Sequence, residues 1–280
     1  MLICRSVSEC RKAVADMRHQ GKRVGMVPTM GFLHHGHMSL VALAQSHSDA
    51  VIVSIFVNPT QFGEAADLEA YPRDEDRDLA MLRAAGVSVV FIPDTDTMYP
   101  SGDETIVETT RLANMLHGQI RPGHFRGVST VVARLFNIVQ PDIAVFGEKD
   151  YQQLQVIKRM VADLHIPVHV IGAPTVREHD GLAMSSRNVR LSSDDRAAAS
   201  ILSRSLNIAE AAFPEVTVDE IHQIISTTIA SEPRAALRGL DIVAAETLET
   251  LEGPVSGPTA IMISVAFGDI LLIDQRVIAP

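Results

Sequence analysis

The feature that most constrains the fold is an alternation of short apolar runs with stretches of helical periodicity through residues 1–175. The clearest apolar run, AVIVSIFV at residues 50–57, is rich in β-branched residues and predicts a strand covered on both faces. Residues 125–139 instead repeat their apolar side chains at helical spacing. Because alternating strands and helices form a parallel sheet with helices on both faces, the pattern predicts an α/β domain.

The remaining elements follow from the same periodicities. Strands are expected at 24–27, 87–93, 142–147 and 167–172, and helices from about Gly36, over 72–86 and over 151–164. Beyond residue 175, helices near 193–212 and 217–231 precede strands at 240–247, 259–267 and 270–273. Helices followed by short strands indicate a smaller α+β lobe. The sequence therefore predicts two domains, residues 1–175 and 176–280.

Composition excludes some classes of partner. The net charge of −10 and the aromatic content of 4% argue against a nucleic-acid surface, which needs clustered cations and stacking rings. No apolar run approaches the roughly 18 residues of a membrane span, and no signal peptide is evident. Cys4 and Cys10 form no metal or redox motif and are expected to be reduced thiols. We expect a cytoplasmic protein with no membrane or nucleic-acid partner.

The strongest chemical motif is PTMGFLHHGH, residues 28–37, which lies directly after a predicted strand and leads into a predicted helix. Backbone N–H groups and the dipole at a helix start favour an anion, and Gly36 lets a phosphate approach. His34 and His37 are three positions apart, so both imidazoles can offer N–H donors on one side of the helix. We therefore predict phosphate binding here.

Two other interpretations of this segment stay open. One is an ordinary helix start that contains histidines, although three histidines within four residues beside a glycine argue against it. The other is a metal pair at His34 and His37, for which the sequence shows no further ligand. Neither GxxxxGK[ST] nor GxGxxG follows the first predicted strand, so a nucleotide would have to bind through the histidine–glycine segment.

A second motif, GEKDYQQL at residues 147–154, also lies between a predicted strand and a helix. Lys149 supplies a mobile positive charge suited to a phosphate or carboxylate. Asp150 is suited to a ribose hydroxyl or to a metal ion. A helix-capping segment with solvated charges is the alternative.

Three further loops are weaker candidates. In DGLAMSSRN, residues 180–188, two hydroxyls and Arg187 can surround a triphosphate, or the segment is an ordinary helix cap. In SIFVNPTQFG, residues 54–63, Asn58 and Gln61 suit a small polar substrate, with a simple turn as the alternative. A cationic loop at 121–130 either covers the site or is a plain surface loop; its charged residues are Arg121, His124 and Arg126.

Together these segments closely resemble the pantothenate synthetase family along essentially the whole chain. The matching segments are PTMGFLHHGH, FVNPTQF, YPR, RPGHFRGV, FGEKDYQQL and DGLAMSSRN, in this order. The HxGH element alone is shared with many nucleotidyltransferases and class I aminoacyl-tRNA synthetases, whereas the later segments are more specific. The resemblance implies a Rossmann-like doubly wound parallel sheet, a smaller C-terminal α+β lid domain, a homodimer, and Mg²⁺ with ATP as a substrate.

The resemblance also implies a reaction and its residues. Pantoate and ATP would form pantoyl-adenylate and pyrophosphate, and β-alanine would then release AMP and give pantothenate. His37 would be the proton donor, acting with His34 and Lys149. Gln61 and Gln153 would hold pantoate, and Gln61 would also border β-alanine. The metal ligands stay open, with Asp150 as a candidate. The ATP site would comprise Met30, Gly31, His34, Gly36, His37, Gly147, Glu148, Lys149, Asp150, Val176, Met184, Ser185, Ser186 and Arg187.

Two departures from the family pattern and two rival functions remain. His35 stands where this family more often has an acidic residue, and Met184 where leucine is common. One rival is an HxGH adenylyltransferase that leaves AMP on its product, against which the Gln61 and Gln153 segments argue. The other rival is a non-catalytic nucleotide sensor or RNA-binding module, which predicts ATP binding without turnover.

Overall fold

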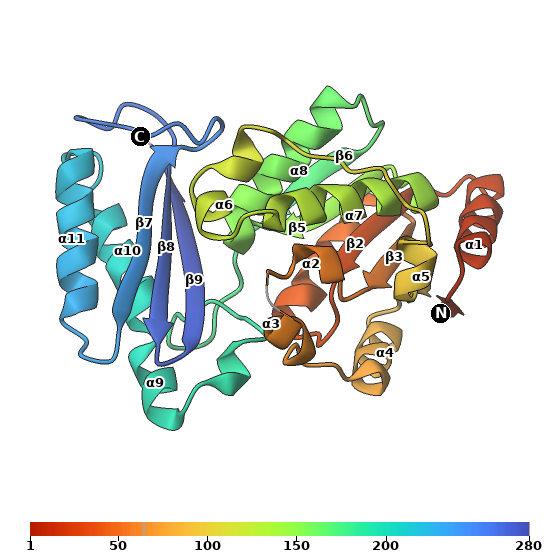
Figure 1. Ribbon diagram of the computed structural model, residues 1–280, viewed down its shortest axis with the longest axis horizontal. Coiled ribbons are helices and arrows are strands. Elements are labelled where there is room, and N and C mark those ends of the chain that lie inside the picture. The colour runs from red at the N-terminus through yellow and green to blue at the C-terminus, as the bar shows by residue number, and fades with distance from the viewer. Residues whose placement is uncertain (64, 280) are drawn as a thin grey trace. The chain divides into compact units, whose positions relative to one another are not determined.

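The computed structural model describes residues 1–63 and 65–279 and divides into two compact units (Figure 1). Unit 1 comprises Met1–Gly147 and Gln153–Ala173. Unit 2 comprises Glu148–Gln152 and the chain from Pro174 onward. The second unit therefore takes a short segment from the middle of the chain, which the predicted division at residues 175 and 176 did not include.

Unit 1 is built on a six-stranded sheet in which every pair of neighbouring strands is parallel. The strands lie in the order β1-β4-β3-β2-β5-β6, so β2 lies between β3 and β5. This confirms the predicted fold class for the larger domain. The strand bounds are β1 Leu2–Cys4, β2 Val24–Thr29, β3 Ala50–Ile55, β4 Val89–Phe91, β5 Ile143–Gly147 and β6 His169–Ala173.

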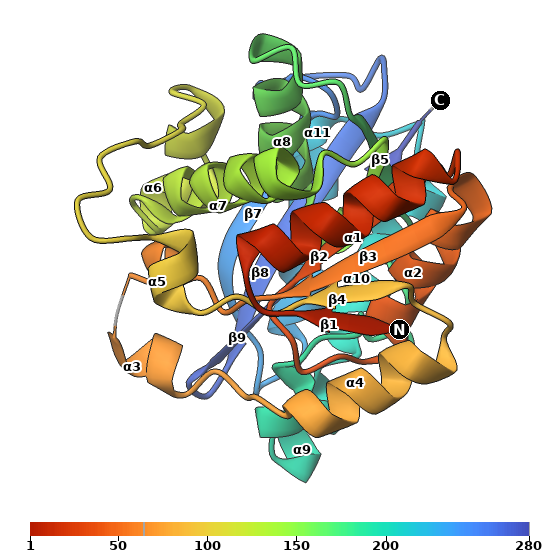
Figure 2. The same ribbon diagram turned by 90° about the vertical axis from the view of Figure 1, so that its right-hand side faces the viewer.

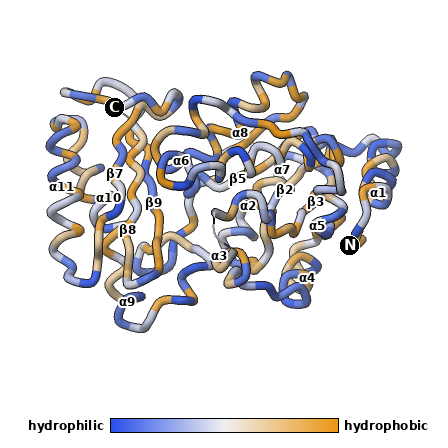
Figure 3. The backbone as a smooth tube through the Cα atoms, viewed as in Figure 1, coloured by the Kyte–Doolittle hydropathy of each residue, from blue (hydrophilic) through white to orange (hydrophobic). Residues whose placement is uncertain are grey.

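Helices cover both faces of this sheet, and successive strand residues alternate between two cores (Figure 2). On one face Met26 and Ile52 pack among side chains of α1, α7 and α8. On the other face Val27 and Val53 pack among side chains of α2 and α4. Because residues one apart on a strand point to opposite faces, a strand covered on both sides must be mainly apolar, and β2 and β3 are coloured mainly toward the hydrophobic end of the scale (Figure 3).

Several helices of unit 1 begin at a side chain that accepts one of their first N–H groups, whereas α6 and α7 have no such side-chain cap. Ser6 and Glu9 form a reciprocal cap at the start of α1, and Asp74 caps α4. Pro72 precedes α4 instead of lying inside it, and Gly86 follows it at a positive φ of 72°. The bounds are α1 Val7–His19, α2 His35–His47, α3 Ala65–Glu69, α4 Glu75–Ala84, α5 Thr95–Met98, α6 His117–Ile120, α7 His124–Val139 and α8 Tyr151–Asp163, with 3₁₀ turns η1 Pro59–Gln61, η2 Leu112–Asn114 and η3 Glu148–Asp150.

Unit 2 has an antiparallel sheet of three strands in the order β7-β8-β9, with helices packed on it. The side chains of β8 are buried along its whole length, and its core includes Ile261 and Ile263 together with Leu206 and Ile225 from two helices. This confirms the predicted α+β lobe. The bounds are η4 Asn188–Arg190, α9 Ser193–Ala198, α10 Ile201–Ala212, α11 Val218–Ala230, β7 Ala236–Ala244, β8 Thr259–Phe267 and β9 Ile270–Ile278.

Three predicted elements differ from the structure, one of them the strand predicted at 240–247, which is β7 at Ala236–Ala244. The helix predicted over 193–212 is two helices, because α9 ends at Ala198 and α10 begins at Ile201. The last strand extends to Ile278, well beyond the predicted residue 273, because it pairs with β8 along its full length. β1 and α1 were not predicted at all. A strand of three residues at a sheet edge has too few residues to show a period, whereas α1 carries a capping box, Ser6 and Glu9, that the prediction did not use.

Within the described residues, no helix is long and apolar enough to cross a membrane.

Helix α7 and the turn η1 come into close contact at Gly127. A Cβ added at Gly127 would lie 2.5 Å from the backbone oxygen of Thr60. Alanine favours a helix over glycine by about 1 kcal/mol, whereas overpacking costs about 1–3 kcal/mol. Because the atoms nearest to the added Cβ would be backbone atoms, at 2.5–2.8 Å, the overpacking cost lies at the upper end of that range. We therefore expect Gly127→Ala to lower the free energy of unfolding by about 1–2 kcal/mol, measured by urea melting. Arg126→Ala, at the exposed neighbouring position, should change it by less than about 0.5 kcal/mol; an equal or stabilising effect of Gly127→Ala would contradict the close contact.

Candidate active site

The segment between β2 and α2 lies at the point where the order of the sheet reverses. β2 pairs with β3 on one side and with β5 on the other, and all three strands end at the same edge. In open α/β sheets a ligand crevice lies beyond the carboxyl ends of the strands at such a point. The segment Met30–His37 therefore occupies the position in unit 1 that this architecture most favours for a binding site.

This segment bends sharply and is held by a buried carboxylate. Gly31 and Phe32 have positive φ angles of 82° and 50°. The two oxygens of Asp78, whose side chain is buried in α4, accept the N–H groups of Phe32 and Leu33 at 2.7 Å each. Thr29 adds a third tie, because its hydroxyl donates to the Ser54 oxygen and accepts the Gly31 N–H. The backbone path into α2 is therefore fixed by named hydrogen bonds.

His34 and His37 lie side by side at the start of α2, with ring centroids 4.1 Å apart. His34 is the N-cap, and its Nδ1 accepts the Gly36 N–H at 3.1 Å. The Nδ1 atom of His37 accepts the His34 N–H at 3.3 Å. Because a neutral imidazole that accepts at Nδ1 carries its proton on Nε2, both rings are fixed in the same tautomer. The arrangement supplies two Nε2–H donors at a helix N-terminus, which suits an anion.

The segment after β3 forms a compact polar turn. Asn58, 1% exposed, caps η1 by accepting the Thr60 N–H. Its amide nitrogen donates to Oε1 of Gln61 at 3.0 Å. Gln61 is half-buried, and its own amide nitrogen lies 3.2 Å from the sulfur of Met30, so the two predicted segments meet inside unit 1. Gln153, the other predicted pantoate residue, is half-buried in α8.

The predicted cationic loop at 121–130 also contacts this turn. Nδ1 of His124 lies 2.8 Å from the backbone oxygen of Gln61, and Gly127 packs on Thr60. The part of the loop from His124 onward is the first turn of α7. The structure therefore places His124 against the turn that carries Gln61.

Lys149 and its neighbours belong to unit 2, apart from Gly147, which ends β5 in unit 1. The Lys149 side chain is 16% exposed, and its Nζ lies 3.9 Å from a carboxylate oxygen of Asp150, which is 51% exposed. The hydroxyl of Tyr151 donates to the Ala245 oxygen at 3.0 Å. Glu148, Lys149 and Asp150 form the turn η3, which contacts β9. That contact is the reason the segment is part of unit 2.

The predicted triphosphate loop forms a narrow hairpin in unit 2. The N–H of Met184 bonds to the Val176 oxygen at 2.9 Å, and Arg177 forms an isolated bridge with Ala183. After the hairpin, the Ser185 hydroxyl accepts the Arg187 N–H at 3.2 Å. The side chains of Met184, Ser185, Ser186 and Arg187 are all half-buried. The structure thus brings the five predicted residues from Val176 to Arg187 into one local unit.

Arg177 holds this hairpin in place and was not predicted from the sequence. Its guanidinium bonds to both carboxylate oxygens of Asp274 in β9, at 2.7 and 3.0 Å. It also donates to the Gly181 oxygen at 3.0 Å. Asp274 is 2% exposed, so the pair fixes the hairpin to the sheet from inside. Nothing in the local sequence marks the pair, because its members are far apart in the chain.

Asp180, in the same hairpin, has a second ion pair. Its carboxylate accepts two hydrogen bonds from Arg196 in α9, one of them at 3.2 Å. These bonds hold the pKa of Asp180 below its ordinary value, while partial burial opposes them. The hairpin before Ser185 is therefore fixed by both Arg177 and Arg196.

The acidic and histidine side chains of the described residues suit a metal ion that binds together with a nucleotide better than a metal ion held by the protein alone. In the described part of the chain, no group of three or more His, Cys, Asp or Glu side chains is placed to hold an ion. Mg²⁺ bound to a nucleotide needs only one or two carboxylates besides the phosphates. Asp150, half-exposed and next to Lys149, fits that use.

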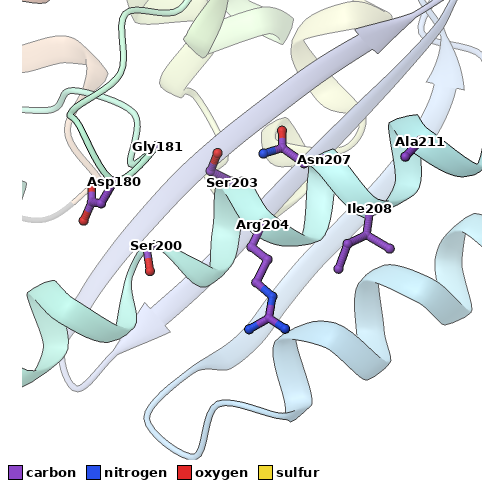
Figure 4. A pocket seen from close by; sticks show the side chains of 8 residues that line it. All are labelled: Asp180, Gly181, Ser200, Ser203, Arg204, Asn207, Ile208 and Ala211. Atoms are coloured by element: carbon purple, nitrogen blue, oxygen red, sulfur yellow. The ribbon is translucent and has the colours of Figure 1, made fainter.

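A separate cavity of about 420 Å³ lies along α10 in unit 2 (Figure 4). It is lined by Asp180 and Gly181 and by α10 side chains that include Ser203, Arg204 and Asn207. None of the residues predicted to bind a ligand lines it. Because Asp180 is already bonded to Arg196, its carboxylate does not mark this cavity as a site.

Comparisons with a family model and with curated relatives all give the same family. The family model for pantoate–β-alanine ligase matches residues 2–277. Pantothenate synthetase of Sinorhizobium medicae is 51% identical over 280 residues, covering 98% of this chain and 95% of the relative. That of Agrobacterium fabrum is 50% identical, covering 99% and 96%.

Two solved structures resemble this chain over nearly its whole length. Pantothenate synthetase from Thermus thermophilus matches with a TM-score of 0.94 and 44% identity, over 100% of both chains. Pantoate–β-alanine ligase from Francisella tularensis, described as complexed with beta-gamma ATP and β-alanine, matches with a TM-score of 0.81 and 34% identity, over 99% and 97%.

The carboxylate of Asp78 gives a prediction about activity. In Asp78→Asn only one side-chain atom can accept an N–H, so one of the two bonds to the loop is lost. A hydrogen bond to a charged group contributes about 1.5–3 kcal/mol, so we expect the turnover rate to fall roughly tenfold or more. Asp76→Asn, at an exposed position of the same helix, is the matched control and should leave the rate within about twofold. Equal rates for the two variants would contradict the anchoring role.

The same variant should alter the dependence of stability on pH. Burial raises the pKa of Asp78 above its ordinary value of 3.8, and the N–H bonds from Leu33 and Phe32 oppose this. The folded state therefore binds the proton more tightly than the unfolded state. The stabilisation that protonated Asp78 contributes to the free energy of unfolding is fully present below pH 3.8. It is lost as the pH rises through the pKa of Asp78 in the folded state. Urea melts at a series of pH values should show that the free energy of unfolding of the native chain, relative to that of Asp78→Asn, falls as the pH rises across this window.

Proposed function

This chain belongs to the pantoate–β-alanine ligase family, and we propose that His34, His37, Lys149, Gln61 and Gln153 carry out the reaction. The reaction is the ATP-dependent condensation of pantoate with β-alanine. A free carboxylate resists attack by an amine, so its oxygen must first become a good leaving group. We propose that pantoyl-adenylate is the activated intermediate, with pyrophosphate released in the first step and AMP in the second.

The observation that carries the proposal is the pair of imidazoles at the start of α2. Both rings accept a backbone N–H at Nδ1, so each carries its proton at Nε2. As pantoate attacks the α-phosphate, negative charge grows on the leaving pyrophosphate. The Nε2–H of His37 then donates a hydrogen bond to that oxygen, and the Nε2–H of His34 stabilises the same charge. Asp78 keeps the loop before them in place.

Lys149 supplies the mobile cation of the ATP site. Its Nζ is partly buried beside Asp150, and a charge of this kind stabilises the phosphoryl group during transfer. Arg187 adds a guanidinium, which can form a bidentate hydrogen bond with two phosphate oxygens. We propose the following ATP-binding residues, as the family resemblance implies: Met30, Gly31, His34, Gly36, His37, Gly147, Glu148, Lys149, Asp150, Val176, Met184, Ser185, Ser186 and Arg187.

Gln61 and Gln153 suit pantoate because a neutral amide can bond both hydroxyls and a carboxylate without changing the charge of the site. We propose that Gln61 also borders β-alanine. The adenylate must be kept from water until the amine attacks, and we assign that lid function to residues 176–280.

An ATP-using ligase of this family works with a divalent metal, and we propose that it is Mg²⁺. The metal would neutralise charge on the phosphates, with Asp150 as its protein carboxylate. We also propose a homodimer in the cytoplasm that binds no nucleic acid.

Pyrophosphate release tests the proposal most directly. With ATP, Mg²⁺ and pantoate, the protein should give a burst of pyrophosphate near its own concentration, and β-alanine should turn this into steady release of AMP. His37→Ala should lower the burst rate at least a hundredfold, since removal of one hydrogen-bond donor to developing negative charge costs roughly 10²–10³. A dinucleotide product would support an adenylyltransferase, and ATP binding without any pyrophosphate would support a sensor. His35→Ala, the exposed neighbour, is the control.

The pantoate assignment has its own test. Gln61→Ala and Gln153→Ala should each raise the KM for pantoate by roughly tenfold, since a lost hydrogen bond is worth about 1 kcal/mol or more. The KM for ATP should stay within about twofold. Gln155→Ala is the control for loss of an amide, because Gln155 lies in α8 two residues after Gln153 and is not assigned to pantoate. An effect confined to ATP would show that the assignment is wrong.

A further inference from the structure

The direction of the Gln61 amide decides what this side chain can bind. One end of a glutamine amide only donates hydrogen bonds, and the other end only accepts them. A substrate carboxylate offers acceptors alone. A glutamine that turns its oxygen toward such a group would repel it, whereas one that turns its NH₂ toward it would bind it.

Asn58 fixes that direction because backbone groups of known polarity flank its own amide. The Thr60 N–H, which can only donate, lies 3.3 Å from one end, so that end is Oδ1. The Gly127 carbonyl, which can only accept, lies 3.2 Å from the other end, so that end is Nδ2. Nδ2 also lies 3.0 Å from Gln61, and the Gln61 atom facing it must be the acceptor Oε1. The NH₂ of Gln61 is therefore turned away from Asn58 and lies 3.2 Å from the sulfur of Met30, a residue of the proposed ATP site.

Tyr99 strengthens this orientation from a distant part of the sequence. Its hydroxyl donates to Oδ1 of Asn58 at 2.7 Å, the shortest of the contacts to that oxygen. Burial raises the pKa of Tyr99, which keeps the hydroxyl a donor. The Thr60 hydroxyl also donates to Oδ1, at 3.0 Å, and lies 3.1 Å from the Tyr99 hydroxyl, so both hydroxyls and the Thr60 N–H converge on this one amide oxygen.

The Tyr99 ring is itself held in place. The Arg134 guanidinium lies 4.5 Å from its centroid, and that guanidinium bonds to both carboxylate oxygens of Asp103 at 2.8 and 2.6 Å. All these residues belong to unit 1. A tyrosine with a fixed ring and a single short bond to a buried amide has little freedom to point elsewhere.

We infer that Tyr99 is a positioning residue for pantoate: through Asn58 it holds the Gln61 amide with its NH₂ toward the substrate. The inference rests on the proposed contact between Gln61 and pantoate. Tyr99 does not touch the substrate, and it acts only through the orientation of Asn58. In this proposal Gln61 presents a hydrogen-bond donor to an acceptor group of pantoate, and its orientation depends on Tyr99, about forty residues from Asn58 along the sequence.

The first experiment is Tyr99→Phe, which removes the hydroxyl and keeps the ring. The KM for pantoate should rise roughly threefold to tenfold, the effect of about one hydrogen bond, while the KM for ATP stays within about twofold. Ser129→Ala removes another buried hydroxyl of unit 1, outside this network, and is the matched control. If both variants change the pantoate KM equally, the effect is general loosening and the inference is wrong.

A second variant reverses the amide instead of loosening it. In Asn58→Asp the side chain can only accept, so Gln61 would turn its NH₂ toward Asp and its oxygen toward the substrate. The KM for pantoate should then rise more than in Asn58→Ala, where Gln61 rotates without a fixed partner. A smaller rise in Asn58→Asp would overturn the inference. Thermal melting of each variant verifies that it is folded.

A double-mutant cycle separates this inference from the function on which it rests. If Tyr99 acts through Gln61, then Tyr99→Phe should add less than about twofold to the pantoate KM in a Gln61→Ala background. Full additivity, or no effect of Tyr99→Phe when Gln61→Ala has one, overturns the inference alone. No effect of Gln61→Ala on the pantoate KM overturns the proposed role of Gln61, and the inference with it.

Discussion

All six strands of the larger sheet run in the same direction, and the candidate site depends on that constraint. Parallel pairing brings the loops after β2, β3 and β5 to one edge, although they lie far apart in the chain. It also requires helices on both faces, and α2 is one of them. The N-terminus of α2, which carries the two imidazoles, is therefore placed at this edge by the topology of the sheet.

Buried polar side chains hold the candidate segments in place, two of them in unit 1 and one in unit 2. Asp78 holds the loop before α2, Asn58 holds the turn with Gln61, and Asp274 holds Arg177 and its hairpin. Burying such groups costs free energy unless each is fully hydrogen-bonded, and the raised pKa of Asp78 reflects that cost. The benefit lies in preorganisation, because a site held in place before the substrate arrives needs no rearrangement during the reaction.

Much of the fold followed from residue patterns. The bounds of β8 and α7 were predicted within one residue, because buried strands and amphipathic helices show clear periods. The edge strand β1 was missed, since three residues are too few for a period, and the division between α9 and α10 left no proline or glycine to mark it. For the candidate site, the motifs predict His34, His37 and Gln61, and those assignments stay predictions; no motif marks Asp78, Tyr99 or Arg177, which hold the same segments in the structure.

The sequence by itself determined the fold class, the family resemblance and the segments that carry the chemistry, since these depend on residues that are neighbours in the chain. Only the tertiary structure decided how those segments are held. Asp78 lies 46 positions from the Phe32 N–H that it accepts, and Arg177 lies 97 positions from Asp274. Local propensity carries no information about such pairs. They form because the packing of helices on a parallel sheet, and of a hairpin on β9, brings the two members together.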